Sequence, residues 1–256
     1  MAARISALNR YRPQIEYGET ADWRELAAYF NTPIAYVVIF VYLIISGAFY
    51  VHFGFSGGVA DLRAFFEWQP LVMALLIPAL TMRLWAEERQ TGTLELLMTF
   101  PLKTWQTVAA KFLAGSCFLA IMLAFTLHLP FIMWMLANDP GPDWGPVIGG
   151  YLGCMAMGMM YLSIGLFASS LTRDQIVALI IGLAICICLW LIGFPVFVTM
   201  IREFSPEVAV WVQNFSIIPH FESISRGVLD TRDLIYVVSV GGFFLLLTNL
   251  VMERRR

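Results

Sequence analysis

The sequence predicts an all-α, polytopic membrane protein with six transmembrane helices. Six stretches of the 256-residue chain carry no charged side chain and are mostly apolar. Hydrophobic residues make up 59% of the composition and charged residues 13%, which would leave a soluble domain of this length without enough polar groups to cover its surface. Lys and Arg are also distributed unevenly between the segments that join these stretches, as expected across a membrane.

The apolar stretches have the lengths that membrane crossing requires, because a helix needs about 20 residues to span a hydrocarbon core of roughly 30 Å. The uncharged runs are Leu26–Ala60, Trp68–Met82, Phe112–Asn138, Trp144–Thr172, Gln175–Ile201 and Leu234–Met252. The second run is short, and it reaches the required length if Arg83 extends its stem to the interface. The expected spans are residues 32–53, 69–86, 108–136, 146–170, 176–201 and 234–252, in one transmembrane domain over 22–252.

The basic residues predict the orientation of these spans. Twelve of the 16 Lys and Arg residues lie on the side that holds both termini. Only Arg63, Arg202, Arg226 and Arg232 lie on the other side. The positive-inside tendency then places the tails, residues 1–21 and 253–256, in the cytoplasm. An even number of spans follows, so the uncharged stretch 208–221 is expected at the outer interface rather than across the membrane.

Before the first span, the segment from Asp22 predicts a short amphipathic helix on the membrane surface. Trp23, Leu26, Ala27 and Phe30 recur at the helical period, and Pro33 suits the first turn of the span that follows. Such a helix would form an elbow that fixes how the first span enters the bilayer. The alternative is a leader that is amphipathic without this role.

The middle spans contain glycine and proline at informative positions. Turn-forming residues are dense over 138–146, which predicts a short outer loop between spans three and four. Gly149 and Gly153 have the spacing that lets two helix backbones approach closely, either within the chain or against a second copy. Pro78, Pro130 and Pro195 can each kink a span whose freed carbonyls find other partners.

Few side chains in the spans suggest chemistry. Cys117, Cys154, Cys186 and Cys188 are expected to pack as small apolar residues, and no metal site is predicted. The histidines His52, His128 and His220 are interpreted as solvated or hydrogen-bonded near an interface, with His128 able to cap a carbonyl beside Pro130. Lys111 is expected to reach back to the cytoplasmic headgroups. With no ionisable residue assigned to mid-membrane, a proton-driven carrier is disfavoured.

The cytoplasmic connection between spans two and three is the most unusual segment. Gly92 can act as an N-cap, Glu95 suits the positively polarised first turn, and Pro101 ends the helix after about two turns. The candidate docking residues, flanked by the acidic pair Glu87 and Glu88, are Glu87, Glu88, Arg89, Gly92, Thr93, Leu94, Glu95, Leu97, Met98 and Pro101. Leu94, Leu97 and Met98 form an apolar face that would fit a groove in another protein or lie among lipid headgroups.

A second segment, between spans five and six, predicts short outer helices. Phe221 begins an apolar series at helical spacing, Gly227 lies near the helix end, and Asp230 is placed to cap the final span. The candidate residues of this segment are Phe221, Glu222, Arg226, Gly227 and Asp230.

The segment Glu87–Leu97, followed by Pro101, resembles the connection between spans two and three in ABC type-2 exporter permeases. The elbow through Tyr36, the turn Leu171–Gln175 and the outer segment His220–Asp233 are similar to the gliding-motility (GldF-like) and nitrous-oxide-reductase maturation (NosY-like) branch. Six spans and these motifs cover nearly the whole chain. The elbow and outer motifs are fairly specific, whereas six apolar spans alone are not.

The resemblance implies a permease subunit of the bacterial inner membrane that pairs with a second copy or a homologous permease. It also implies that the outer segment caps the outer mouth, with its candidate residues forming a functional gate or a static lid as equal alternatives. A separate ATPase subunit would bind ATP and magnesium and dock on a coupling helix at Gly92–Phe100, and a periplasmic accessory protein is possible. The chain itself has no G-x-x-x-x-G-K-[ST] phosphate loop, so no bound cofactor and no enzymatic activity are expected in it. No nucleic-acid partner is expected either.

Two other functions remain open. The chain could transmit ATP-driven motion to an outer partner without moving cargo. It could also be an intramembrane enzyme, although Ser163, His128 and the scattered acids suggest no convergent catalytic set. The cargo is not predicted.

Overall fold

The computed structural model describes residues 33–54, 62–93, 103–136, 143–227 and 230–254. All regular elements in these ranges are helices, which agrees with the predicted all-α class. The predicted elbow at residues 22–31 lies outside the described residues. Five helices are long and apolar enough to cross a membrane, and one bent pair of helices could form a sixth span. The chain is therefore a multi-pass membrane protein.

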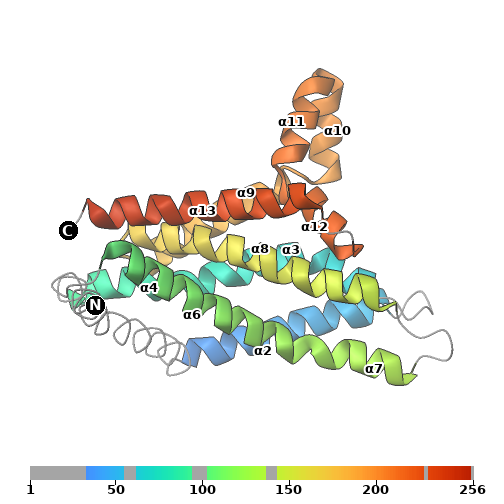
Figure 1. Cartoon of the computed structure of the whole chain (residues 1–256), viewed down its shortest axis with the longest axis horizontal. Helices are drawn as coiled ribbons and strands as arrows, with labels where there is room; N and C mark the ends of the chain where they lie inside the picture. The colour runs from blue at the N-terminus through green and yellow to red at the C-terminus, as the bar shows by residue number, and fades with distance from the viewer. Residues whose placement is uncertain (1–32, 55–61, 94–102, 137–142, 228–229, 255–256) are drawn as a thin grey trace, which may run out of the picture.

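The first two spans pack side by side, and the first of them lies at one edge of the bundle (Figure 1). Helix α2 runs over Pro33–Phe49 and continues into the π-helical segment η1, Tyr50–Gly54, while α3 covers Arg63–Thr81. A buried polar chain joins them: the Tyr42 hydroxyl donates to Gln69 Oε1 at 3.0 Å, and Gln69 Nε2 donates to Ser46 Oγ at 3.4 Å. Each of these three buried side chains thus has a hydrogen-bond partner, as an apolar surrounding demands.

The second span continues past α3 as α4, Arg83–Gln90, after a break at Met82. The candidate membrane span Phe65–Gln90 is therefore longer at both ends than the predicted span 69–86.

The third span contains a change of helix type that Pro130 explains. Helix α6, Thr104–Ala124, passes through the 3-10 segment η3, Phe125–Leu127, into α7, His128–Leu136. Pro130 has no N–H for the Thr126 carbonyl, and the Tyr151 hydroxyl donates to that oxygen at 3.0 Å instead. Nδ1 of the exposed His128 lies 2.6 Å from the Phe125 carbonyl oxygen, so the predicted carbonyl cap is present.

Helix α8, Trp144–Leu171, is the centre of the bundle. It packs against α3, α6 and two helices further along the chain. These are α9, which covers Gln175–Leu191, and α13, which covers Thr231–Glu253. Of the 18 most apolar consecutive residues of α8, 72% are buried. The corresponding share for α13, which lies at the periphery (Figure 1), is 17%. Glycines allow this close packing, and a Cβ on Gly165 would collide with the Thr81 side chain at the end of α3.

The predicted fifth span, 176–201, is not one straight helix. Helix α9 ends at Leu191, and α10, Pro195–Phe204, leaves at 65° to it. Pro195 occupies the first turn of α10, where its missing N–H and fixed φ suit a helix start but not the interior of a longer helix. Gly193 in the break packs so closely on Ser216 that any Cβ would overlap that side chain.

Short helices precede the final span, as predicted. Helices α10 and α11, Pro206–Phe215, form a hairpin that projects sideways from one end of the bundle, and α12, Ile217–Ser225, lies at its base (Figure 1). Val198 and Ala209 are buried between the two hairpin helices, whereas Phe204 and Trp211 are 90% and 77% exposed. The hairpin therefore presents apolar side chains outside the bundle.

Candidate functional site

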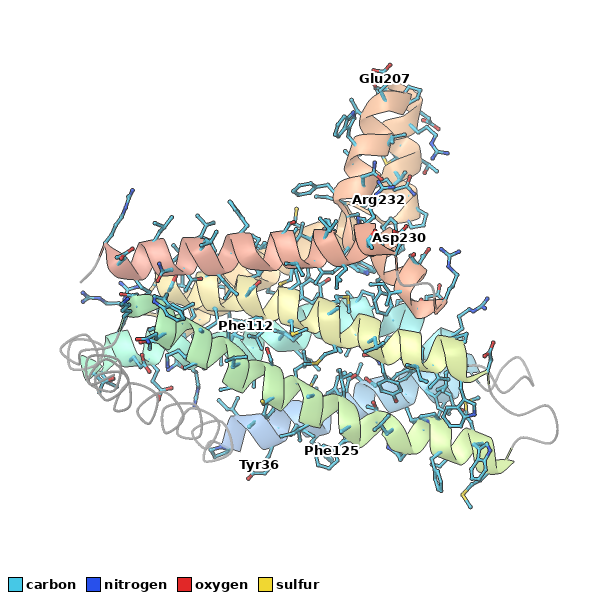
Figure 2. The ribbon with its side chains drawn as sticks, viewed as in Figure 1. Tyr36, Phe112, Phe125, Glu207, Asp230 and Arg232 are labelled. Atoms are coloured by element: carbon cyan, nitrogen blue, oxygen red, sulfur yellow. The ribbon has the colours of Figure 1, made fainter. Side chains whose placement is uncertain are left out.

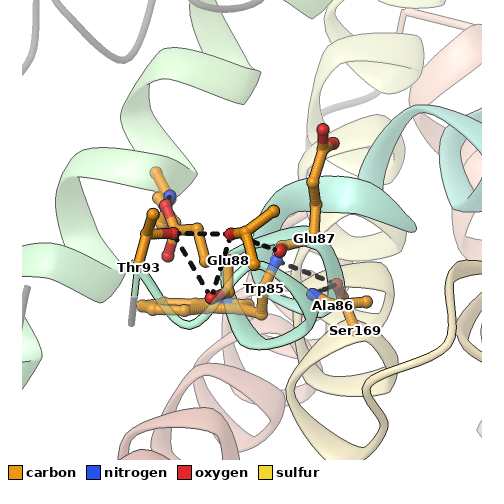
Figure 3. Close-up of polar contacts among 8 residues, drawn as sticks. Trp85, Ala86, Glu87, Glu88, Thr93 and Ser169 are labelled. Carbon is orange, nitrogen blue, oxygen red and sulfur yellow. Dashed lines mark hydrogen bonds and ion pairs between the residues drawn. The ribbon is translucent and has the colours of Figure 1, made fainter. Parts of the chain in front are cut away.

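The break between α3 and α4 is held by a side chain from α8. The Ser169 hydroxyl accepts from the amides of Trp85 at 3.0 Å and Ala86 at 3.2 Å, and it donates to the Met82 carbonyl oxygen at 2.9 Å. Figure 3 shows this hydroxyl beside the first turn of α4. A side chain inserted into the helix hydrogen-bond ladder is a recognised cause of a helix break. Helix α4 is thereby fixed to α8.

Arg89 makes a second connection from α4 to α8. Its Nη1 donates to the carbonyl oxygens of Ser170 at 2.9 Å and Thr172 at 3.0 Å, at the C-terminal end of α8. A cation in this position satisfies carbonyls that lack helical partners and complements the negative end of the helix dipole. Arg89, predicted as a docking contact, therefore also holds two parts of this chain together through its guanidinium.

Lys111 makes a third connection, from α6 to α4. Its Nζ lies 2.6 Å from Glu88 Oε1 and 5.0 Å from the centre of the Trp85 ring, and the lysine side chain is 2% exposed. The prediction that Lys111 reaches to the headgroups is wrong. A carboxylate and an aromatic face compensate its buried charge, which a long aliphatic stem alone would not. Glu88, predicted as a docking contact, is likewise engaged within the chain.

The remaining docking candidates follow the end of α4. Glu87 is exposed, and its carbonyl oxygen accepts from the Thr91 hydroxyl at 2.9 Å, while the Thr93 hydroxyl lies 2.9 Å from that of Thr91. Gly92 has φ +75°, in the left-handed region that glycine adopts readily after a helix C-cap. The sequence predicted Gly92 only as an N-cap. Five further candidates lie outside the described residues: Leu94, Glu95, Leu97, Met98 and Pro101.

The residues that hold α4 were missed by sequence reasoning. Ser169 is one of many small residues in α8, and nothing in its spacing distinguishes it. Lys111 carried a signal, because a charged residue directly before a 27-residue uncharged run invites a search for a partner. Its partner lies 23 residues away in the chain, on another helix.

At the opposite end of the bundle, the predicted gate or lid residues lie in and after α12. Phe221 is buried, Glu222 and Arg226 are exposed, and Gly227 has φ +83°. Asp230 caps α13, since its side chain accepts from the Arg232 amide at 3.1 Å. Both the left-handed glycine and the cap follow the sequence prediction.

Helix α12 is seated on the glycines at the start of α8. A Cβ on Gly149 would lie 2.5 Å from the Ile224 carbonyl oxygen, and one on Gly153 would lie 3.2 Å from the side chains of Ile224 and Phe221. The close contact predicted for this glycine pair is therefore internal. It joins α8 to the short outer helix rather than to another span.

His220 connects α12 to the hairpin and to the last span. The buried ring lies with Nδ1 2.6 Å from Asp233 Oδ1 and Nε2 3.1 Å from the Asn214 carbonyl oxygen, and it stacks on Tyr236 with ring centres 4.2 Å apart. A carbonyl only accepts, so Nε2 must donate to it. The sequence predicted a solvated or hydrogen-bonded histidine, and the structure gives the hydrogen-bonded form, away from solvent.

Two further contacts fasten the hairpin to α13. Arg232 Nη2 donates to Asn214 Oδ1 at 2.6 Å, and the Tyr236 hydroxyl donates to the Phe215 carbonyl oxygen at 2.7 Å. Figure 2 shows Arg232 at the base of the hairpin and Glu207 at its tip.

A cavity of about 650 Å³ lies at the same end, between α3, α8, the α9–α10 break and α12. The gate candidates Phe221, Glu222 and Arg226 contribute to its lining. Among the described residues, no group of three or more His, Cys, Asp or Glu side chains is arranged to hold a metal ion.

Comparison with protein families gives a match over most of the chain. The family described as ABC-2 family transporter protein matches residues 27–231, which extend from before α2 into the start of α13. Comparison with curated proteins gave no match. The match covers most of the 256 residues and agrees with the multi-pass helical fold. The chain belongs to the ABC-2 transporter family.

Proposed function

We propose that this chain is the membrane-spanning subunit of an exporter driven by a separate ATPase. The ATPase would bind ATP and magnesium and would dock on the segment that follows α4, from Gly92 to Phe100. The observation that supports this proposal best is the attachment of α4 to three spans. It continues α3, it is bonded to α8 by Ser169 and Arg89, and it is paired with α6 through Glu88 and Lys111.

This attachment assigns different tasks to the predicted docking residues. Glu88 and Arg89 would keep α4 fixed to the bundle, so that a displacement of the docked segment moves several spans together. The exposed Glu87 would face the ATPase, and Leu94, Leu97 and Met98 would supply the apolar insert. Gly92 would set the direction in which the chain leaves α4.

The remaining features of the complex follow from the family and from the charge distribution. A second permease copy, identical or homologous, would complete the membrane-embedded pair. The α4 end would face the cytoplasm and the α12 end the outside of the inner membrane, since most Lys and Arg residues belong to the α4 side. Membership of the GldF-like or NosY-like branch, with a periplasmic accessory protein, is part of this proposal.

Co-purification of the ATPase with the permease tests the docking surface. We expect Leu94→Asp together with Leu97→Asp to abolish association, because two carboxylates cannot enter an apolar groove without losing their hydration. The matched control, Leu94→Met with Leu97→Met, keeps the apolar volume and should retain the ATPase. Undiminished association of a correctly inserted aspartate variant would contradict the docking role.

A mechanotransmission subunit is the second candidate, and the hairpin supports it. Helices α10 and α11 project from the bundle and are bonded to α13 through Asn214 and Phe215, so movement of the last span would move a surface that an outer partner could read. ATP hydrolysis stimulated by that partner, without movement of any candidate cargo in liposomes, would distinguish this function from export.

The intramembrane enzyme has less support. The Ser163 hydroxyl donates to the Met160 carbonyl oxygen, and the His128 ring contacts the Phe125 carbonyl oxygen, each within its own span. The two side chains are thus not paired as nucleophile and base among the described residues.

A further inference from the structure

The cavity at the α12 end lies beside the broken fifth span. Helix α9 stops at Leu191, the chain turns through 65° before α10, and Trp190, Phe194 and Pro195 at this break border the cavity. The cavity volume of about 650 Å³ falls in the range of small-molecule sites. Nothing in the docking of an ATPase at the α4 end requires such a space.

Aromatic rings form much of the cavity wall: Phe66, Trp68, Trp190, Phe194 and Phe221 all line it. Indole and phenyl faces attract cations, most strongly in the case of Trp, and they also bind acyl and glyceryl carbons. A purely polar ligand would use little of this surface. The wall therefore favours a ligand that has apolar parts.

Charged side chains of both signs line the same cavity. Arg63 and Arg226 supply guanidinium groups, which suit the oxygens of a phosphate, whereas Glu67 and Glu222 supply carboxylates, which suit an ammonium group. Arg226 Nε donates to the Glu222 carbonyl oxygen at 3.1 Å, which fixes the guanidinium at the end of α12. Asp143 also lines the cavity, but its Oδ1 accepts from the Gly145 amide, and it caps α8.

The surroundings point to a ligand that arrives from the bilayer. Exposed apolar side chains lie within two residues of lining residues in the sequence on two helices: Trp144 and Ile148 on α8, and Val196 and Phe197 on α10. Acyl chains could lie along these side chains while a headgroup occupies the cavity. A Trp close to the end of a span is also typical of the membrane interface, where headgroups are found.

We propose that this cavity binds the headgroup of a zwitterionic phospholipid, a lipid that carries both a phosphate and an ammonium group. Arg63 and Arg226 bind the phosphate. Glu67 and Glu222, with the aromatic rings, bind the ammonium group. The proposal goes beyond transport driven by an ATPase and does not depend on it, because the site is formed by one chain at the end remote from α4.

Native mass spectrometry of the purified full-length chain with defined lipids tests the site. We expect the unaltered chain to bind phosphatidylethanolamine about tenfold more tightly than phosphatidylglycerol, which has no ammonium group. Glu67→Gln with Glu222→Gln should reduce the ratio of the affinities for phosphatidylethanolamine and phosphatidylglycerol to about one. Arg63→Gln with Arg226→Gln should weaken both lipids by about tenfold. The matched control is Arg202→Gln, on α10 outside the cavity lining, which should change neither affinity.

Three results would overturn the proposal. The unaltered chain could bind the two lipids equally, the folded Glu67→Gln and Glu222→Gln double variant could keep the full preference, or equimolar glycerophosphoethanolamine could displace the phospholipid. The last result would show that acyl chains contribute nothing and that the ligand is a soluble headgroup. Should the double variant fail to fold, the two single variants carry the same test, each with a partial loss of preference.

Discussion

At the scale of single residues, the α4 end depends on hydrogen bonds that a buried hydroxyl supplies. Ser169 satisfies two amides and one carbonyl at the α3–α4 break, and its side chain comes from a different helix. Ser170, the next residue, donates its hydroxyl to the Phe167 carbonyl oxygen in its own helix. Of these two adjacent serines, the Ser169 hydroxyl therefore connects two helices, whereas the Ser170 hydroxyl bonds within its own helix.

This difference gives a first prediction. Ser169→Ala should lower the free energy of unfolding of the purified chain by about 1–3 kcal/mol, because it leaves buried backbone groups unsatisfied. The melting temperature should fall accordingly. Ser170→Ala should cost less than about 0.5 kcal/mol, since serine within a helix adds little by bonding its own turn. Fluorescence-detected size-exclusion chromatography after heating measures both. Equal losses for the two variants would show that Ser169 does not hold the break.

The sequence predicted residue roles well where the signal was local. Gly227 and Asp230 were identified because a left-handed glycine and an aspartate cap are recognised within a few residues. The prediction for Lys111 was wrong, and the pairing of Glu88 with it was not foreseen, because both side chains seemed directed at partners outside the chain. Only the fold brings them within 2.6 Å of each other.

At the scale of elements, the contact of α12 with α8 depends on the absence of side chains at Gly149 and Gly153. At Gly149 the nearest atoms to an added Cβ belong to backbone, namely the Ile224 carbonyl oxygen and Gly227. Backbone cannot move aside as the end of a flexible side chain can. The small-residue spacing was read from the sequence, but its partner was not, because any apolar helix could have filled the groove.

A second prediction follows for this contact. Gly149→Ala should force α12 away from α8 and lower thermal stability by about 1–3 kcal/mol, the usual cost of overpacking. Gly242→Ala in α13 is the matched control, because nothing lies within 4 Å of the added Cβ there. It should be neutral or slightly stabilising, since alanine favours a helix. Comparable destabilisation by both alanines would refute the packing argument.

His220 gives a third prediction, for the hairpin. His220→Ala removes the ring that joins Asp233 to the Asn214 carbonyl, and it leaves a buried carboxylate without that partner. We expect hydrogen exchange in α10 and α11 to rise by about tenfold, which corresponds to about 1.4 kcal/mol of lost local stability. His128→Ala, at an exposed ring, serves as the control and should leave exchange in the hairpin unchanged. An unaltered hairpin in the His220 variant would mean that Arg232 and Tyr236 hold it without the histidine.

The broken fifth span shows why element boundaries are harder to predict than element types. Residues 175–201 are uniformly uncharged, so hydropathy alone favours one long span. The break depends on Gly193 packing against Ser216, a contact between residues that only the folded chain brings together. Pro195 was recognised as a potential kink, yet proline within membrane helices is too common to locate a break by itself.

At the scale of the whole molecule, the multi-pass helical class followed directly from composition and from the uncharged runs. These features reflect whether a segment lies in lipid or in water, so the class can be predicted from them without knowledge of tertiary contacts. The outer cavity could not be foreseen in the same way. It is lined by residues from five helices, α3, α8, α9, α10 and α12, and no sequence segment contains more than part of its wall.

The proposed orientation gives a fourth prediction. In a variant whose four cysteines are replaced, Glu207→Cys at the hairpin tip should react with a membrane-impermeant maleimide in intact cells. Thr91→Cys, after α4, should react only once the membrane is opened. Both positions are exposed in the folded chain, so accessibility reports the side of the membrane rather than burial. Labelling of Thr91→Cys in intact cells would reverse the orientation.

Helix α8 has one further consequence at this scale. Ser169, which holds the start of α4, and Gly149, on which α12 rests, belong to a single uninterrupted helix of 28 residues. At about 1.5 Å per residue, this helix places the two contacts roughly 30 Å apart. Axial compression of an α-helix is small, so a push received near Ser169 reaches the far contact almost undiminished. Events at the two membrane surfaces are consequently joined by one stiff rod, without a relay of successive side-chain rearrangements.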